Sequence, residues 1–194
     1  MNNRTLGTLT ILLSPTLALA SLASKSNGQW DNKASALLGL AFLVGWFCAA
    51  LGLRRARATG HGRVALGVFV LQLVLLTLAA CQQVMDLLPG PHNPIFYHIA
   101  DLSWPASMVC MLVVGLLVLQ ARVWTSWRRW VPILCGITLP IFFLLVALGY
   151  RKAGADLFEA YSFVMWALLG LAVRQSPEAE ATEPGVPYSL SSGL

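Results

Sequence analysis

The sequence predicts an all-α integral membrane protein, a compact up-and-down bundle of six transmembrane helices whose two ends lie in the cytoplasm. Three observations predict it. Of the 194 residues, 57% are hydrophobic and only 11% are charged, whereas soluble domains carry about 25% charged residues. The hydrophobic residues form runs about as long as a helix needs to cross a membrane. The charged residues gather in short clusters between these runs, as they do beside lipid headgroups.

Six stretches are apolar enough, or nearly so, to cross a hydrocarbon layer about 30 Å thick, which takes about 20 helical residues. They are residues 5–23, 34–53, 64–86, 101–121, 131–150 and 157–174. Strands are disfavoured because the runs are continuous, and because an open sheet edge leaves backbone polar groups unsatisfied in lipid. Residues 1–174 are therefore predicted to form one transmembrane domain. Its connections are short, so consecutive helices should lie side by side and antiparallel.

The first stretch allows two interpretations. Arg4, an apolar core and the small residues Ala18 and Ala20 resemble a signal peptide, which would be removed. Pro15 inside the core and the continuation of the apolar run through Leu22 favour a retained helix. Cleavage would leave five spans in the same orientation.

Four prolines and one glutamine within the predicted spans have expected structural effects. Pro15 and Pro140 should bend their helices, because proline removes an amide donor and crowds the preceding turn. Pro105 and Pro132 are predicted to lie in first turns, which tolerate proline. Gln72 falls inside the third span, where we expect its amide to hydrogen-bond to a neighbouring helix.

The basic residues predict the orientation, because cytoplasmic loops of membrane proteins carry an excess of Lys and Arg. With the N-terminus inside, nine of the 13 basic residues are cytoplasmic, and the remaining four, Lys25, Lys33, Arg151 and Lys152, are outside. The cytoplasmic set is Arg4, Arg54, Arg55, Arg57, Arg63, Arg122, Arg128, Arg129 and Arg174. Six of these are candidate contacts for anionic lipid: Arg54, Arg55, Arg57, Arg63, Arg128 and Arg129. Each would contribute about 1 kcal/mol, although orientation alone also explains them.

The second span carries a ridge of small residues: Gly39, Ala41, Gly45 and Ala49. Such a ridge lets the backbone of another helix approach closely, which is how helices associate in lipid. The pattern does not say whether that helix belongs to the same chain or to a second copy.

Strongly polar residues gather at the predicted outer ends of the helices. The candidate cluster is Gln82, Asp86, His98, Asp101 and Glu159. If these ends converge, the cluster would line an outward-facing pocket for an ion or a small amphiphile, and His98 with a carboxylate could serve as an acid–base pair. The alternative is structural. Asp101 would be a helix N-cap, and Asp156 with Glu159 a variant of the capping box.

No motif names a reaction, a cofactor or a metal, and the sequence shows the diagnostic residues of no familiar small multi-pass family. No ionisable residue is placed near mid-bilayer, which disfavours pumps and light-driven proteins. The cysteines have no CxxC spacing and are interpreted as small buried hydrophobes: Cys48, Cys81, Cys110 and Cys135. Nucleic acid is excluded as a partner because the basic residues flank apolar runs.

Residues 175–194 are rich in Glu, Pro and Ser and are predicted to form a disordered cytoplasmic tail. The expected location is the cell membrane, the inner membrane if the source is bacterial. The expected partners are the lipid bilayer and either a second copy or another membrane protein. The first functional hypothesis is a non-enzymatic scaffold or accessory subunit. The alternatives are binding or transport through the outer pocket, and an enzyme that uses His98.

Overall fold

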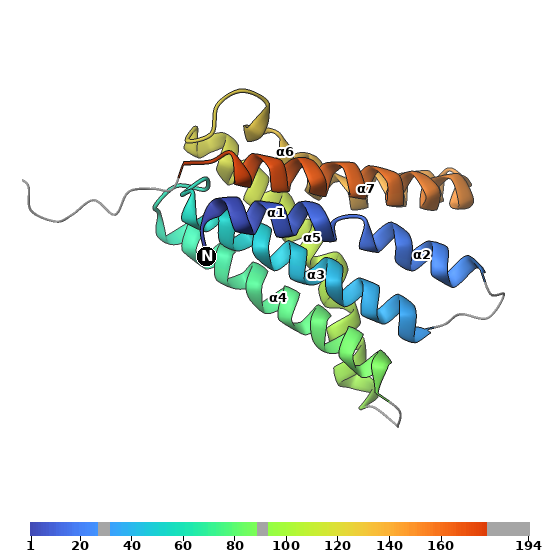
Figure 1. The fold of residues 1–194 in the computed structure, drawn as a ribbon. Coiled ribbons are helices and arrows are strands. Elements are labelled where there is room, and N and C mark those ends of the chain that lie inside the picture. The colour runs from blue at the N-terminus through green and yellow to red at the C-terminus, as the bar shows by residue number, and fades with distance from the viewer. Residues whose placement is uncertain (27–31, 89–92, 178–194) are drawn as a thin grey trace, which may run out of the picture.

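The computed structural model describes residues 1–26, 32–88 and 93–177 (Figure 1). Throughout these residues the chain forms helices and no strands. The helices are α1 (Asn3–Leu13), α2 (Thr16–Ser26), α3 (Asn32–Arg55), α4 (Arg63–Leu87), α5 (Pro94–Ala121), the short 3₁₀ helix η1 (Ser126–Arg129), α6 (Val131–Ala147) and α7 (Arg151–Arg174). The all-α prediction is confirmed. From residue 178 onward the predicted tail lies outside the described residues.

Within the described chain, five helical segments are long and apolar enough to cross a membrane. They are Asn3–Leu22, Lys33–Arg55, Arg63–Leu87, Pro94–Ala121 and Gly154–Arg174. The first of them combines α1 with most of α2. α6 is also apolar but has only 17 residues. These segments agree with the predicted bundle of apolar helices.

The first span is interrupted at Pro15, as the sequence predicts. α1 ends at Leu13 and α2 begins at Thr16. Because Pro15 has no amide hydrogen, it cannot continue the helical hydrogen-bond ladder. The Ser14 hydroxyl donates to the carbonyl of Ile11 at 2.8 Å, and the Thr16 hydroxyl donates to that of Leu13 at 2.7 Å. By contrast, α6 continues through its own proline.

α5 begins earlier than its apolar run does. Its N-cap is Asn93, whose side-chain oxygen accepts hydrogen bonds from the backbone amides of Ile95 at 3.0 Å and Phe96 at 3.2 Å. Pro94 then fills the first helical position, where a missing amide costs little. The prediction that Asp101 caps this helix is therefore wrong, and Pro105 lies inside the helix rather than in its first turn.

α7 also begins before the predicted boundary, at Arg151 rather than residue 157. Tyr150 is the residue before its first turn, and no side chain caps the helix there. Asp156 and Glu159 lie well inside α7, so the predicted capping box is wrong. A run of apolar residues identifies only the part of a helix that lies in hydrocarbon. Polar turns that extend the helix beyond that run are not predicted by it.

The helices form a closed ring. From α2 to α7 each helix packs against the next one in the sequence, and α7 packs against α1, which also packs on α3 (Figure 1). The ring closes where Gly7 of α1 meets Gly170 of α7. A Cβ at Gly170 would lie 2.8 Å from the carbonyl oxygen of Gly7, and one at Gly7 would lie 2.5 Å from the amide nitrogen of Arg174. Glycine therefore permits this backbone contact.

Aromatic side chains fill the centre of the ring. The ring centroids of Trp46 on α3 and Trp166 on α7 are 4.3 Å apart, and each residue is only 1% exposed. Phe42 of α3 stacks on Trp104 of α5 with centroids 5.8 Å apart. This cluster therefore joins three helices that are far apart in the sequence.

The outer surface of the bundle is apolar. Large apolar side chains are exposed on every long helix, among them Val70, Leu71 and Val74 on α4, Leu102, Val109 and Leu116 on α5, and Phe163 and Val164 on α7. In water, such surface costs about 25 cal/mol per Å² relative to burial, whereas lipid solvates it well.

The small-residue ridge of α3 packs inside the chain. A Cβ at Gly39 would lie 2.6 Å from the side-chain oxygen of Gln83 on α4, and a Cβ at Gly45 would lie 2.9 Å from the Cβ of Leu13 on α1. Ala49 is fully buried. At Gly39, Gly45 and Ala49 the ridge therefore packs inside the chain, while Ala41 is partly exposed.

Candidate functional site

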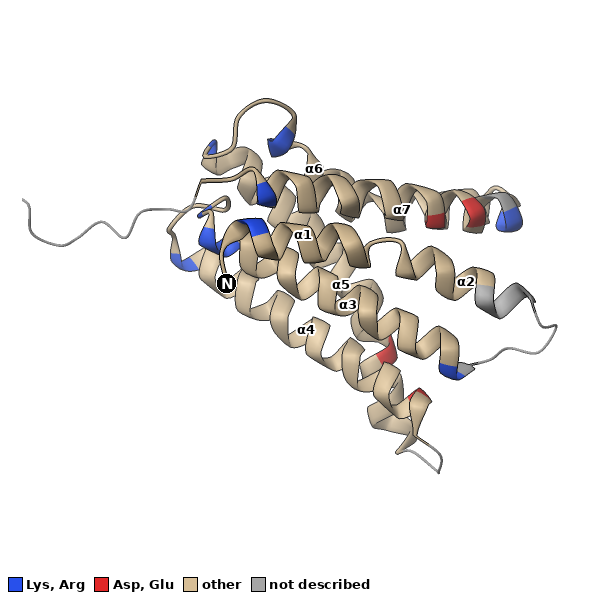
Figure 2. Ribbon diagram, in the orientation of Figure 1, with Lys and Arg blue, Asp and Glu red and all other residues tan. Residues whose placement is uncertain are grey.

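Charge separates between the two ends of the ring (Figure 2). One end brings together the N-terminus of α1, the α3–α4 connection, the α5–α6 connection and the C-terminus of α7, and these segments carry the nine basic residues predicted to be cytoplasmic. Arg128 of η1 donates to the carbonyl of Gln175 at 3.3 Å, which ties two of these segments together. We call this end the basic end. The acidic residues of the described helices belong to segments at the opposite end, namely the end of α4 and the first halves of α5 and α7: Asp86, Asp101, Asp156 and Glu159. Three basic residues, Lys33, Arg151 and Lys152, also begin helices at that end.

At that opposite end, the predicted cluster is partly formed between α4 and α5. The Tyr97 hydroxyl donates to Asp86 Oδ1 at 3.0 Å, and the Gln82 amide nitrogen donates to Asp86 Oδ2. Gln83 in turn donates to Gln82 Oε1 at 2.7 Å. The carboxylate thus joins the two helices of a hairpin. Sequence reasoning missed Tyr97 because it placed this residue in a loop.

His98 and Asp101 lie on the same side of α5, one turn apart, and both are exposed. The His98 ring makes an edge contact with the Tyr97 ring at a centroid distance of 6.2 Å. Among the residues that the structure describes, neither the His98 side chain nor the Asp101 side chain has a hydrogen-bond partner. The contact that an acid–base pair requires is not made there.

Glu159 lies apart from the α4–α5 group. Its carboxylate accepts a hydrogen bond from the hydroxyl of Ser21, which joins α7 to α2. Asp86 therefore links α4 to α5 by a hydrogen bond, and Glu159 links α7 to α2. In the described part of the chain, no three metal-ligating side chains come together.

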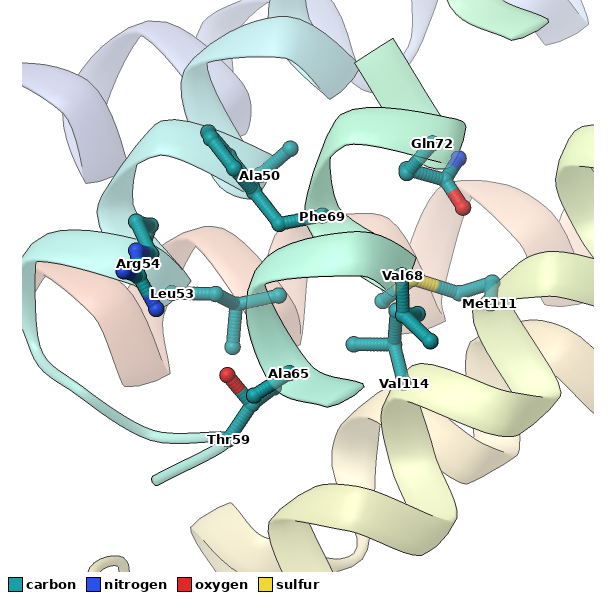
Figure 3. A pocket seen from close by; sticks show the side chains of 10 residues that line it. All are labelled: Ala50, Leu53, Arg54, Thr59, Ala65, Val68, Phe69, Gln72, Met111 and Val114. Atoms are coloured by element: carbon teal, nitrogen blue, oxygen red, sulfur yellow. The ribbon is translucent and has the colours of Figure 1, made fainter. Parts of the chain in front are cut away.

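A narrow slot lies between α3, α4 and α5 (Figure 3). Its lining residues come from the end of α3, the start of α4 and the second half of α5, so it lies in the half of the bundle toward the basic end. Its volume is about 20 Å³. Arg54 and Thr59 lie at one side of the slot, and Gln72 lies at the other (Figure 3). Between them the walls are apolar: Ala50, Leu53, Ala65, Val68, Phe69, Met111 and Val114.

Gln72 is the most deeply buried of the three polar residues that line this slot. Its side chain is 2% exposed, and neither its amide nitrogen nor its amide oxygen has a partner in the described structure. The prediction that Gln72 bonds to a neighbouring helix is therefore wrong.

A second cavity, of about 200 Å³, lies between α6 and α7. Its walls are almost entirely apolar and include Phe142, Leu157 and Phe158. The Tyr161 hydroxyl, at its edge, donates to the carbonyl of Leu134 at 3.2 Å. This cavity could accept part of an apolar chain, but it offers little for polar recognition.

Comparison of the chain with models of known protein families, with characterised proteins and with solved structures finds no match. The class of protein is therefore given by its fold alone. It is an all-helical bundle with several apolar helices long enough to cross a membrane.

Proposed function

We propose that the chain is a multi-pass protein of the cell membrane that crosses the bilayer six times, with its N-terminus and the C-terminal end of α7 in the cytoplasm. The single observation that carries this proposal is the uneven distribution of charge (Figure 2), because nine of the 13 basic residues belong to the segments at one end of an apolar bundle. α6 counts as a crossing because its 17 residues fall at the lower limit for a transmembrane helix, about 17–25 residues.

Within the membrane, the proposed role is that of a non-enzymatic scaffold or accessory subunit. The centre of the ring is occupied by aromatic side chains, and two acidic side chains of the predicted outer cluster bond to neighbouring helices. The partner would be a second copy or another membrane protein that contacts the exposed apolar faces. The alternatives, an outer pocket for an ion or amphiphile and an acid–base site at His98, have less support, because Asp86 and Glu159 bond to different helix pairs and the exposed His98 side chain has no hydrogen bond to a described carboxylate.

The threading can be tested with single cysteines in a cysteine-free variant of the full chain. Thr125→Cys and Lys152→Cys are suitable because both positions are exposed and they flank α6. We expect a membrane-impermeant maleimide to label residue 125 only from the cytoplasmic side and residue 152 only from the outside. Labelling of both from one side would remove α6 as a crossing, and the reverse pattern would overturn the orientation.

The scaffold role can be tested by crosslinking in native membranes followed by native mass spectrometry. We expect the chain to be recovered in a defined complex with a second copy or another membrane protein. His98→Ala and Asp101→Asn should leave that complex intact, because both side chains are exposed and make no hydrogen bond in the described structure. Gly45→Leu should disrupt the fold itself, because Leu13 occupies the space. Recovery of a lone monomer would contradict the proposal.

A further inference from the structure

The first turn of α1 and the last turn of α7 lie side by side at the basic end. A Cβ at Gly7 of α1 would lie 2.6 Å from the Cβ of Arg174, so the end of α7 packs directly on this face of α1. Arg4 is three residues before Gly7 and therefore lies on the same face. The side-chain amide of Asn3 donates to the carbonyl of Ser176 at 3.4 Å, which joins the two helix ends. Two arginines far apart in the sequence are thus brought to one place.

A polar cavity of about 730 Å³ lies between these two helix ends. Arg4 and Arg174 line it, together with the amide and hydroxyl side chains of Asn2, Gln175 and Ser176. Both arginines are exposed, and none of the described residues that line the cavity is acidic. Sites for small molecules are about 300–1,000 Å³, so the cavity has room for an anionic group and part of the molecule that carries it.

A third arginine adds to the positive charge around this cavity. Arg128 of η1 donates to the carbonyl of Gln175 at 3.3 Å, and Gln175 is one of the lining residues. Like charges on neighbouring turns of helices repel each other, and an anion bound between the guanidinium groups removes this repulsion. The charge of the cavity therefore favours an anionic ligand.

The shape of the guanidinium group indicates which anion fits. Each guanidinium donates through a planar fork that matches two oxygens of a carboxylate or a phosphate. A carboxylate has only two oxygens, and the fork of a single arginine takes both. A phosphate monoester has three free oxygens and a charge of about −1.5 to −2 at pH 7. It can therefore accept hydrogen bonds from Arg4 and Arg174 at the same time.

We infer that Arg4 and Arg174 form a binding site for a phosphate monoester between the start of α1 and the end of α7. The monoester is the headgroup of a lipid such as phosphatidic acid or a soluble phosphate compound. Neither arginine belongs to the six that the sequence marks as candidate contacts for anionic lipid. The site goes beyond the proposed scaffold role and does not depend on it, since the packing of α1 on α7 alone forms it.

The ratio of two lipid affinities tests this site. Native mass spectrometry of the full chain in detergent would measure binding of phosphatidic acid, a monoester, and of phosphatidylglycerol, a diester. We expect the unaltered chain to prefer phosphatidic acid by about tenfold, because the monoester accepts at least one more hydrogen bond from a charged donor. Arg4→Gln, Arg174→Gln should abolish this preference. Equal affinities for the two lipids in the unaltered chain would overturn the inference.

Arg55→Gln, Arg63→Gln is the matched control, because it removes the same charge from the same end and neither residue lines the cavity. This variant should bind both lipids more weakly and keep their affinity ratio. Arg4→Lys, Arg174→Lys retains the charges and the alkyl stems but replaces each fork by a point charge, so the ratio should fall here too. An unchanged ratio in both Arg4, Arg174 variants, or an equal fall in the control, would also overturn the inference.

Competition with excess glycerol phosphate distinguishes the two sources of the monoester. Displacement of phosphatidic acid from the unaltered chain would show that a soluble monoester binds at the same site. Retention of phosphatidic acid would show that its acyl chains add to the affinity and that the ligand is a lipid. Either result supports the site where the Arg4, Arg174 variants have lost the preference for the monoester.

Discussion

The Tyr97 hydroxyl illustrates how one side chain can join two membrane helices. It donates to Asp86 at 3.0 Å across the α4–α5 hairpin, and Gln82 donates to the same carboxylate. Hydrogen bonds to charged groups contribute about 1.5–3 kcal/mol when buried. Tyr97 and Asp86 are only half-buried, so the contribution here should be smaller.

We therefore expect Tyr97→Phe to lower the free energy of unfolding by on the order of 1 kcal/mol. Phenylalanine keeps the aromatic ring and its packing, so the loss in free energy of unfolding measures the contribution of the hydroxyl group alone. Steric-trap unfolding in bicelles would measure it. Asp101→Asn is the control, because the exposed Asp101 side chain makes no hydrogen bond in the described structure, and its effect should be negligible. A loss in the control equal to that in Tyr97→Phe would show that the network contributes nothing specific.

At the scale of elements, the α5–α6 contact depends on two glycines. A Cβ at Gly115 of α5 would lie 2.5 Å from backbone atoms of Ile133, and one at Gly136 of α6 would lie 2.5 Å from the amide nitrogen of Leu112. Both contacts are with backbone, which cannot turn aside as a side chain can. The two helices therefore approach as closely as glycine allows.

Gly115→Ala should consequently destabilise the bundle by about 1–3 kcal/mol, the usual cost of overpacking. Gly67→Ala is the matched control, since Gly67 is exposed on α4 with nothing near its Cβ position. That change should be neutral, or stabilising by up to about 1 kcal/mol, because alanine favours the helix. Thermal unfolding in detergent would compare the two variants. Similar losses in both would contradict a close α5–α6 approach.

The sequence predicted the helices better than their contacts. Hydrophobic runs located every long helix, because lipid exposure requires apolar residues along about 20 positions. The start of α7 was missed because its first turn, around Lys152, is polar. The start of α5 was missed because its first turn, Pro94–Tyr97, was assigned to the connection before the span. The ridge around Gly45 was identified as a packing face from its repeated small residues. Gly115 and Gly136 are not part of such a repeat, so their packing role was not predicted.

At the scale of the whole molecule, ring closure was the least predictable feature. Short connections predict that sequential helices are neighbours, and these contacts are confirmed. The contact of α1 with α7 joins segments more than 100 residues apart and depends on Gly7 and Gly170. For the same reason the polar cluster could not be assembled from the sequence. Whether Asp86 and Glu159 meet depends on which helices are neighbours in the ring, and Glu159 faces Ser21 of α2.

The charge separation of the whole bundle leads to a last prediction, on anionic lipid. Arg55 and Arg63 are exposed at the basic end, and Arg151 and Lys152 are exposed at the opposite end, where acidic side chains also lie. Each basic residue near a headgroup layer contributes about 1 kcal/mol of attraction to anionic lipid. The double variant Arg55→Gln, Arg63→Gln should therefore weaken phosphatidylglycerol binding by about 2 kcal/mol, roughly thirtyfold.

Native mass spectrometry of the detergent-solubilised chain, titrated with phosphatidylglycerol, would measure this loss. Arg151→Gln, Lys152→Gln removes the same formal charge from the other end and should weaken binding much less, because the acidic residues Asp156 and Glu159 follow in the same helix and oppose anionic lipid there. Titration with zwitterionic phosphatidylcholine should distinguish neither variant from the unaltered chain. Added salt should reduce the difference between the variants, because it screens exposed charges. Equal losses for the two pairs would mean that net charge, rather than its concentration at one end, governs lipid binding.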